Sequence, residues 1–248
     1  MLKLNERERK FMALLEICVD TLDGLNIAVA NGADRIELCS ALTLGGLSPS
    51  YALLAAAQRC NVPVHVMVRP RPGSFIYSPD ELSFMVHEIE QIKQMGLAGV
   101  VIGGGSELGL DWVALKLLCN AGQGLDITVH RVIDLLPSNE RMAAMEELNK
   151  MGVKRILTSG GAAKAIDALG DIKSLIAKSP EGFVVMPGSG VTTDNIEYIV
   201  SETNALEIHA SASVSIGHVS EKAIKLGFDS SDRRTTSAEV IRSMKAKL

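Results

Sequence analysis

Several side chains that can bind metals stand at or just after the ends of short apolar runs in this sequence. Cys18 lies in the run LLEICV, Cys39 follows the run RIEL, and His130 and His209 occupy similar places later in the chain. Thiolates, thioethers and imidazoles bind soft or borderline metals, above all copper(I) and zinc. Two facing thiols, Cys18 and Cys39, would form a near-linear copper(I) site, with Met67, His130 and His209 as additional candidate ligands. The alternative is that each cysteine is only a small apolar packing group.

The same segments carry groups suited to acid–base catalysis. Either Glu16 or Glu37 could act as a general base, and either His130 or His209 as an acid or base. Arg69 would clamp an anion. Two enzyme classes are disfavoured: no lysine ends a predicted strand, as a Schiff-base aldolase would require, and the serines lack the nucleophile elbow of a hydrolase triad.

Small and polar residues form loops after three later apolar runs, in the segments TSGG (158–161), MPGSGVTTDN (186–195) and HASA (209–212). Glycine-rich backbone at a helix N-terminus donates N–H groups to phosphate, and the loops after strands seven and eight of a barrel frequently do so. Ordinary turn chemistry is the alternative. The candidate anion-binding residues are Ser159, Gly160, Gly188, Gly190 and Ser211.

The elements that must position these groups repeat along the chain. The segments NGADRIELCS (31–40), MGLAGVVIGG (95–104) and MGVKRILTSG (151–160) each read as a helix end at a glycine, a short strand and a loop. Helix-period stretches such as 80–95 and 139–151 lie between the strands. Eight strands are predicted, at Leu14 to Val19, Arg35 to Leu38, Pro63 to Val68, Gly99 to Ile102, Asp126 to Val129, Arg155 to Leu157, Gly182 to Met186 and Ala205 to Ile208.

Eight strands alternating with helices over 248 residues predict a single-domain TIM (β/α)₈ barrel spanning residues 12–248. Residues 1–11 read as a solvated extension. The main rival is an open doubly wound sheet, but CVDT at 18–21 replaces the glycine fingerprint expected after its first strand.

Strand alternation predicts which side chains point into this barrel, because residues two apart share a face. Helices cover the outside, so the apolar sets, such as Leu15, Ile17 and Val19 or Leu206 and Ile208, should face outward. The inward sets are then polar: Glu16, Cys18 and Asp20; Arg35, Glu37 and Cys39; His65, Met67 and Arg69; Thr128 and His130; Glu207, His209 and Ser211. A polar network that only fixes strand register is one interpretation. A ligand site at the C-terminal strand ends is the interpretation we favour.

Composition excludes several classes of protein. The chain is 47% hydrophobic, so it can bury a large core, and its net charge of −4 with 4% aromatic residues argues against a nucleic-acid binder. No apolar run approaches the roughly 20 residues that span a bilayer. The N-terminus lacks the pattern of a secretory signal, which indicates a cytoplasmic location. The cysteines should then be reduced, with Cys60 and Cys119 as packing residues.

Seven segments together resemble the CutC family of copper homeostasis proteins over most of residues 13 to 212. They are LEICVD, GADRIELCS, VMVRPR, VHRVID, RILTSG, VMPGSG and EIHASA, in the family's order. The resemblance implies a TIM barrel, a cytoplasmic protein and copper(I) binding, with Cys18 and Cys39 matching the cysteines discussed as ligands. It also adds Asp134 to the catalytic candidates. The matching recurrent polar positions are Glu16, Glu37, Arg69, His130, Arg131, Asp134 and His209.

The chain departs from the family pattern in three loops. RPRPG at 69–73 stands where the family tends to have RPRGG, and IGGG at 102–105 replaces a bulkier loop. Ser213 stands where the family often has an arginine, which removes a group that could bind an anion. These departures affect the anion site more than the cysteine pair.

The leading hypothesis is therefore a cytoplasmic copper(I)-binding barrel of the CutC type. The alternative is an uncharacterised barrel enzyme that acts on a small, perhaps phosphorylated, metabolite through Glu37, His130 and His209. A third reading is an interaction module that uses residues 213–236. A homo-oligomer is left open, and neither a nucleic acid nor a membrane is expected as a partner.

Overall fold

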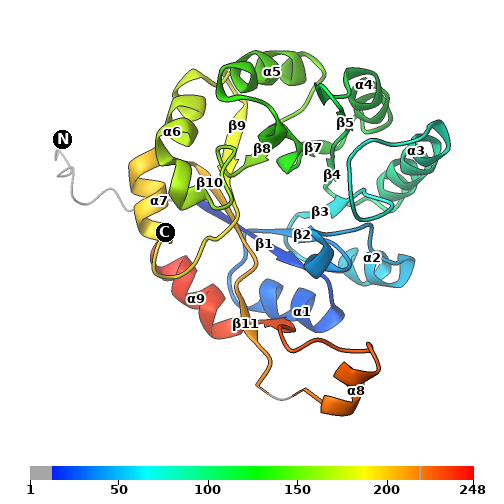
Figure 1. Cartoon of the computed structure of the whole chain (residues 1–248), viewed down its shortest axis with the longest axis vertical. Helices are drawn as coiled ribbons and strands as arrows, with labels where there is room; N and C mark the ends of the chain where they lie inside the picture. The colour runs from blue at the N-terminus through cyan, green and yellow to red at the C-terminus, as the bar shows by residue number, and fades with distance from the viewer. Residues whose placement is uncertain (1–12, 218) are drawn as a thin grey trace.

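In the computed structural model, which describes residues 13–217 and 219–248, eight parallel strands form one sheet that curves into a barrel (Figure 1). Their order is β10-β1-β2-β3-β4-β7-β8-β9, and β9 and β10 contact each other at the seam. The predicted TIM barrel is confirmed. The strands are β1 (Leu14–Val19), β2 (Arg35–Leu38), β3 (Val64–Met67), β4 (Gly99–Ile102), β7 (Asp126–Val129), β8 (Arg155–Thr158), β9 (Val184–Pro187) and β10 (Glu207–Ala210).

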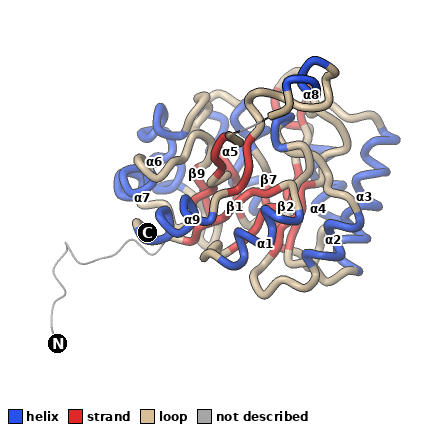
Figure 2. Tube along the Cα trace, turned by 90° about the horizontal axis from the view of Figure 1, so that it is seen from below, coloured by secondary structure: helices blue, strands red, loops and turns tan. Residues whose placement is uncertain are grey.

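Helices surround the strands on the outside, as Figures 1 and 2 show from two directions. Helix α3 illustrates why they form: Ser78 and Glu81 make a capping box, Pro79 starts the helix, and Met85, Ile89 and Ile92 face the core. The surrounding helices are α1 (Leu22–Ala30), α2 (Tyr51–Ala57), α3 (Pro79–Gln94), α4 (Trp112–Ala121), α5 (Ser138–Lys150), α6 (Leu169–Lys178), α7 (Ile196–Thr203) and α9 (Ala238–Ala246).

Short elements occupy the loops between these layers. They are the two-residue strands β5 (Gly105–Ser106) and β6 (Gly109–Leu110) and the 3-10 turns Leu42–Leu44, Arg131–Leu135 and Ala165–Ala168. After β10, strands β11 (Ser213–Ser215) and β12 (Arg234–Thr236) pair antiparallel and enclose helix α8 (Glu221–Lys225). We call residues 213–236 the C-terminal hairpin. In Figure 2, α8 lies at the edge of the molecule, at one end of the barrel.

The apolar core lies between the outer strand faces and the helices. Leu15, Ile17 and Val19 are fully buried there, as strand alternation predicts. Leu206 is an exception, because 72% of it is exposed. The reason is that the last strand begins at Glu207, two residues later than predicted, which leaves Leu206 before the strand and outside the helix layer.

Strand positions follow the sequence closely. Four strands have the predicted bounds, and the third, sixth, seventh and eighth differ by one or two residues at one or both ends. The predicted extension, residues 1–11, and Met12 lie outside the described residues. Within the described part of the chain, no helix combines the length and apolar character needed to cross a bilayer.

Candidate functional site

Ion pairs fill the part of the barrel interior nearest the N-terminal strand ends. Arg35 on β2 pairs with Glu16 on β1 and with Glu207 on β10. Arg155 on β8 continues the chain of contacts, 2.9 Å from Glu207 and 3.0 Å from Asp126 on β7. Because these partners come from strands that are not all neighbours, their side chains must meet inside the barrel. We call Glu16, Arg35, His65, Asp126, Arg155 and Glu207 the lower network.

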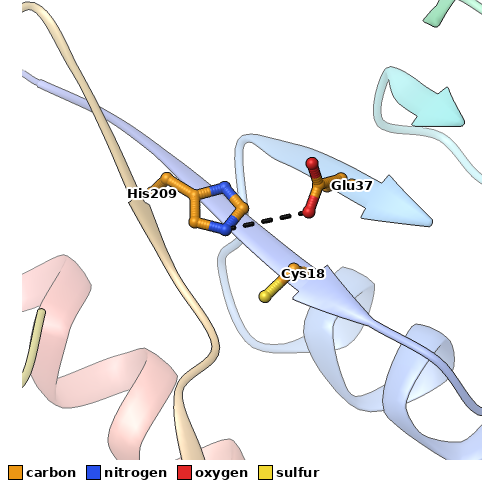
Figure 3. A group of neighbouring side chains, drawn as sticks. All are labelled: Cys18, Glu37 and His209. Atoms are coloured by element: carbon orange, nitrogen blue, oxygen red, sulfur yellow. Dashed lines mark ion pairs between the residues drawn. The ribbon is translucent and has the colours of Figure 1, made fainter. Parts of the chain in front are cut away.

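A thiol, a carboxylate and an imidazole meet one layer above, toward the C-terminal strand ends (Figure 3). Cys18 and Glu37 are partners in the β1–β2 ladder, and His209 lies on β10 at the other side of β1. One ligand atom from each lies within 4.8 Å of the others, and all three residues are buried. We call Cys18, Glu37 and His209 the triad. Its donor atoms could hold a metal ion.

Hydrogen bonding orients the imidazole of the triad. His209 Nδ1 lies 2.8 Å from Glu16 Oε1, so this nitrogen is held toward the lower network. The other ring nitrogen, Nε2, then faces Glu37 Oε2 at 3.8 Å. A carboxylate that fixes one imidazole nitrogen and leaves the other for a ligand is the usual arrangement behind a metal-binding histidine.

The groups around the triad hold different charges. Burial acts to raise the pKa of Glu16, but the His209 hydrogen bond and the Arg35 charge outweigh it and hold the pKa well below the ordinary value. Burial acts to lower the pKa of His209, but facing Cys18 and Glu37 raise it well above its usual value. Burial raises the pKa of both Glu37 and Cys18. Glu16 and His209 thus form a charged pair, and burial disfavours the charged forms of the adjacent Glu37 and Cys18.

Cys39, the other predicted metal ligand, lies apart from the triad. The ladder pairs Cys18 with Glu37, so Cys39 is two residues, or about 6–7 Å, further along its strand. Its sulfur is 3.6 Å from Glu37 Oε2, and it packs with Met67 and Val101. Burial and Glu37 raise its pKa well above the usual value. Among the described residues, the group whose ligand atoms all lie within 4.8 Å of one another is Cys18, Glu37 and His209, without Cys39.

A cavity of about 550 Å³ opens above the triad, and Cys18, Glu37 and His209 line it. Its volume is in the range of small-molecule sites, about 300–1,000 Å³. Arg69 and His130 also line it, and both contact the ring of Phe75, at 5.0 Å and 4.6 Å from its centre. Three buried polar atoms of lining residues have no partner: Glu37 Oε1, Arg69 Nε and His130 Nε2.

The remaining predicted residues divide into two groups. Gly190 and Ser211 line the cavity. The backbone N–H groups of Ser159, Gly160 and Gly188 instead donate within the protein, to Asp134, Thr158 Oγ1 and the Thr158 carbonyl. Asp134 accepts from this loop and pairs with Arg131 at 2.9 Å, so it holds the loop after β8 together. All four cysteines are free thiols.

Sequence reasoning did not single out three residues of the site. Arg155 and Asp126 have the inward parity of their strands, so alternation alone could have indicated them. Arg234 comes from the C-terminal hairpin and lines the cavity. Its guanidinium lies against Ser213, the residue that stands where the family often has an arginine. No local pattern places residue 234 beside residue 213, because the loop between them sets that pairing.

These features define a (β/α)₈ barrel with a buried thiol–carboxylate–imidazole site beneath a cavity of small-molecule size. The chain matches the CutC family over residues 13–214 and belongs to that family. A CutC family protein of Rhizobium meliloti (strain 1021) is 45% identical over 235 residues, which cover 94% of this chain and 95% of the relative.

A solved structure agrees with this assignment. A crystal structure from Streptococcus agalactiae, provisionally assigned as a copper homeostasis protein CutC, has a TM-score of 0.77 and 30% identity. It covers 81% of this chain, and 99% of its own chain is covered. The thiamine phosphate pyrophosphorylase of Pyrococcus furiosus has a TM-score of 0.57 at 12% identity, with 96% of each chain covered. At that identity the likeness shows the fold alone.

Proposed function

We propose that this chain is a cytoplasmic copper homeostasis protein of the CutC type that binds copper(I) as its cargo at the C-terminal end of the barrel. The observation that carries the proposal is the triad, in which a buried sulfur, nitrogen and oxygen lie within 4.8 Å of one another. The provisional assignment of the S. agalactiae relative to copper homeostasis supports the choice of metal.

The donor chemistry favours a soft ion at Cys18 and His209. Thiolate and imidazole suit copper(I), whereas the carboxylate of Glu37 is a harder donor that suits zinc better. Glu16 holds His209 Nδ1, which leaves Nε2 directed toward Cys18 and Glu37. Cys39, close behind Glu37, is the second candidate thiol. Cys18 and His209 are therefore the principal proposed ligands, and Cys39 completes the set.

Anaerobic titration with copper(I) against a competing chromophoric chelator tests these roles. Cys18→Ser should weaken binding at least tenfold, the order of loss typical when a metal site is disturbed. Cys39→Ser should have a smaller effect, and the double variant the largest. Cys60→Ser is the control, because Cys60 packs against the core and does not line the cavity. Equal affinity of wild type and Cys18→Ser would exclude Cys18 as a ligand.

The pH dependence gives an independent check. The pKa of the Cys18 thiol and that of His209 are both raised, so protons occupy the donor atoms at neutral pH. A metal must displace those protons. Copper(I) affinity should thus increase with pH across the neutral range in wild type, and the increase should be smaller in Cys18→Ser. An affinity independent of pH would contradict the proposed donors.

A second candidate function is an enzyme that acts on a small anionic metabolite through Glu37, His130 and His209. The Arg69 and His130 side chains in the cavity wall favour it. A crystal soaked in phosphate should place the anion beside Gly190 and Ser211. Repeated absence of the anion from this cavity would count against the second candidate and leave the copper proposal unaffected.

A further inference from the structure

The C-terminal hairpin brings a guanidinium to the cavity from far along the chain. We propose that Arg234 binds the oxyanion group, a phosphate or a carboxylate, of a small organic ligand in the cavity, with Arg69 as a second, fixed positive charge. This inference deepens the second candidate function, because it names a ligand class. It is independent of copper binding and of any catalytic step.

Strand pairing fixes the backbone of Arg234 beside the end of β10. The register of the hairpin places Arg234 opposite Ser215 and Thr236 opposite Ser213. Arg234 Nε donates to Ser213 Oγ at 2.9 Å, and Nη2 donates to the Ser213 carbonyl. Ser213 Oγ in turn lies 3.0 Å from Ser211 Oγ. These contacts keep the guanidinium at the cavity wall. Its partner Ser213 lies four residues after His209 in the chain.

The charge of Arg234 has no counter-ion in the described part of the chain. Its recorded hydrogen bonds go to Ser213 and Ser215, and no carboxylate lies within ion-pair distance. Arg131, which lines the same cavity, differs in this respect because Asp134 neutralises it at 2.9 Å. The exposed guanidinium of Arg234 is therefore a positive group at the cavity wall that is free to pair with an anionic ligand.

Arg69 strengthens this reasoning because it is only 5% exposed. Its guanidinium donates to the carbonyls of Leu44, Gly46 and Gly73, at 2.9, 3.1 and 3.0 Å, and Nε has no partner. Carbonyls hold the group in place but do not neutralise it. A buried charge without an opposite charge is costly. An oxyanion in the cavity would offset part of that cost through its negative charge.

His130 supplies a neutral donor beside Arg69. Its Nδ1 accepts from the Val132 N–H at 3.1 Å, so the proton of the neutral ring resides on Nε2. That Nε2 is buried without a partner. Burial, with a contribution from Arg69, lowers the pKa of His130 to about 3, which keeps the ring neutral. The cavity wall thus carries two cationic side chains, Arg69 and Arg234, beside a neutral imidazole, which suits an anion.

Calorimetric titration of the metal-free protein tests the proposal with three probes. Glycerol 3-phosphate and malate represent the phosphate and carboxylate sources of an oxyanion, and glycerol is the neutral reference. Wild type should bind at least one of the two anions at least tenfold more tightly than glycerol. The preferred anion identifies which head group the site takes.

Variants of neighbouring arginines separate a specific role from a change of net charge. Arg234→Gln should weaken the preferred anion about tenfold or more, since a hydrogen bond to a charged group is worth about 1.5–3 kcal/mol and each 1.4 kcal/mol is tenfold. Arg234→Lys should retain part of the affinity. Arg233→Gln removes the same charge one residue away, from a side chain that pairs with Asp229 and does not line the cavity. It should bind like wild type.

Three results of these titrations would overturn different parts of the proposal. If Arg234→Gln binds the preferred anion as wild type does, Arg234 is not the anion-binding group, although the second candidate function survives. If wild type prefers neither anion to glycerol, both the inference and that candidate function are overturned. If Arg233→Gln loses as much affinity as Arg234→Gln, the effect is long-range electrostatics, and the specific role is overturned. Copper(I) affinity should be unchanged in Arg234→Gln in every case.

Discussion

The two ends of the barrel interior hold similar residue types, but the partners of their charged groups differ. In the lower network each charged group has at least one partner of opposite charge: Glu16 and Glu207 with Arg35, and Asp126 and Glu207 with Arg155. At the C-terminal end, Arg69 has only carbonyl partners, and Glu37 Oε1 and His130 Nε2 have none. The charged groups of the lower network thus neutralise one another, although Asp126 Oδ1 has no partner, whereas Arg69 at the upper end has no opposite charge.

Glu16 joins the two regions, because one oxygen faces Arg35 and the other faces His209. The lower network therefore supports the triad by fixing the imidazole that completes it. We therefore expect substitutions in the lower network to affect mainly the stability of the protein. Substitutions around the cavity should affect mainly ligand binding. The following variants test that division.

Arg35→Met should destabilise the protein most. It leaves Glu16 with only His209 and Glu207 with only Arg155 as partners in a buried region. Breaking a buried pair from one side typically costs about 3–5 kcal/mol. Chemical denaturation should show the loss as a lower midpoint with an unchanged slope.

Lys150→Met is the matched control for Arg35→Met. Lys150 pairs with Glu147 at 2.6 Å on the surface of α5, where 67% of its side chain is exposed. Exposed pairs contribute little, so its midpoint should equal that of wild type. A normal midpoint for Arg35→Met as well would refute the structural role of the lower network.

Glu16→Gln should have the next largest effect and lower the free energy of unfolding by about 3 kcal/mol at pH 7, because it removes the charge that both Arg35 and His209 face. The folded pKa of Glu16 lies below the unfolded one, because the stabilising contacts of His209 and Arg35 outweigh burial. The stability it contributes is therefore present above its unfolded pKa, about 4.3, and is lost as pH falls toward the folded value. The difference in stability between wild type and variant should therefore begin to shrink as pH falls below about 4 and shrink further toward the folded pKa.

Glu37→Gln is the contrasting variant in the upper region. Burial raises the folded pKa of Glu37, so wild type loses stability as pH rises from the unfolded pKa toward the folded one. Glutamine does not ionise, so the variant does not lose this stability, and its side chain has the shape of a neutral glutamic acid. The variant should thus be at least as stable as wild type at pH 7, with a smaller fall in stability toward high pH. Equal damage from Glu16→Gln and Glu37→Gln would remove the distinction between the two regions.

The sequence was sufficient for much of this comparison. The period-two alternation of β1 and β2 puts Glu16, Cys18 and Glu37 inside, and the fold then makes them neighbours of His209. Which atoms pair is a different matter. The register between β1 and β2 places Cys18 opposite Glu37 rather than opposite Cys39. No pattern within a single strand specifies that register.

Loop geometry was also beyond the sequence. The polar loop after β8 suggested an anion site, but the carboxylate of Asp134 occupies its N–H groups. That carboxylate comes from a different loop, and its hydrogen bonds depend on tertiary packing. The same is true of Arg234, which reaches the cavity through a hairpin closed over a loop of about twenty residues. Long-range contacts of this kind carry no local sequence signal.

Gly103→Ala should have an intermediate effect and act on the upper region. A Cβ at Gly103 would lie 2.1 Å from His130 Cε1, so the ring must move. Overpacking of this kind costs about 1–2 kcal/mol. Thermal unfolding should show the loss, and the NMR signals of His130 should shift. Gly170→Ala, where the new methyl group meets no atom within 4 Å, should leave both unchanged. An unshifted His130 in Gly103→Ala would contradict its packing against the cavity wall.

Arg234→Gln should have the smallest effect on stability and so complete the comparison with Arg35. Both arginines lie on strands and donate to neighbouring residues, but Arg35 is buried between two carboxylates and Arg234 is exposed beside two serines. Surface substitutions of this kind change stability by less than about 0.5 kcal/mol. Denaturation midpoints of Arg234→Gln and wild type should therefore coincide, even where anion binding differs tenfold. A loss of stability close to that of Arg35→Met would mean that the hairpin belongs to the structural framework, and its arginine would then have to be counted with the lower network.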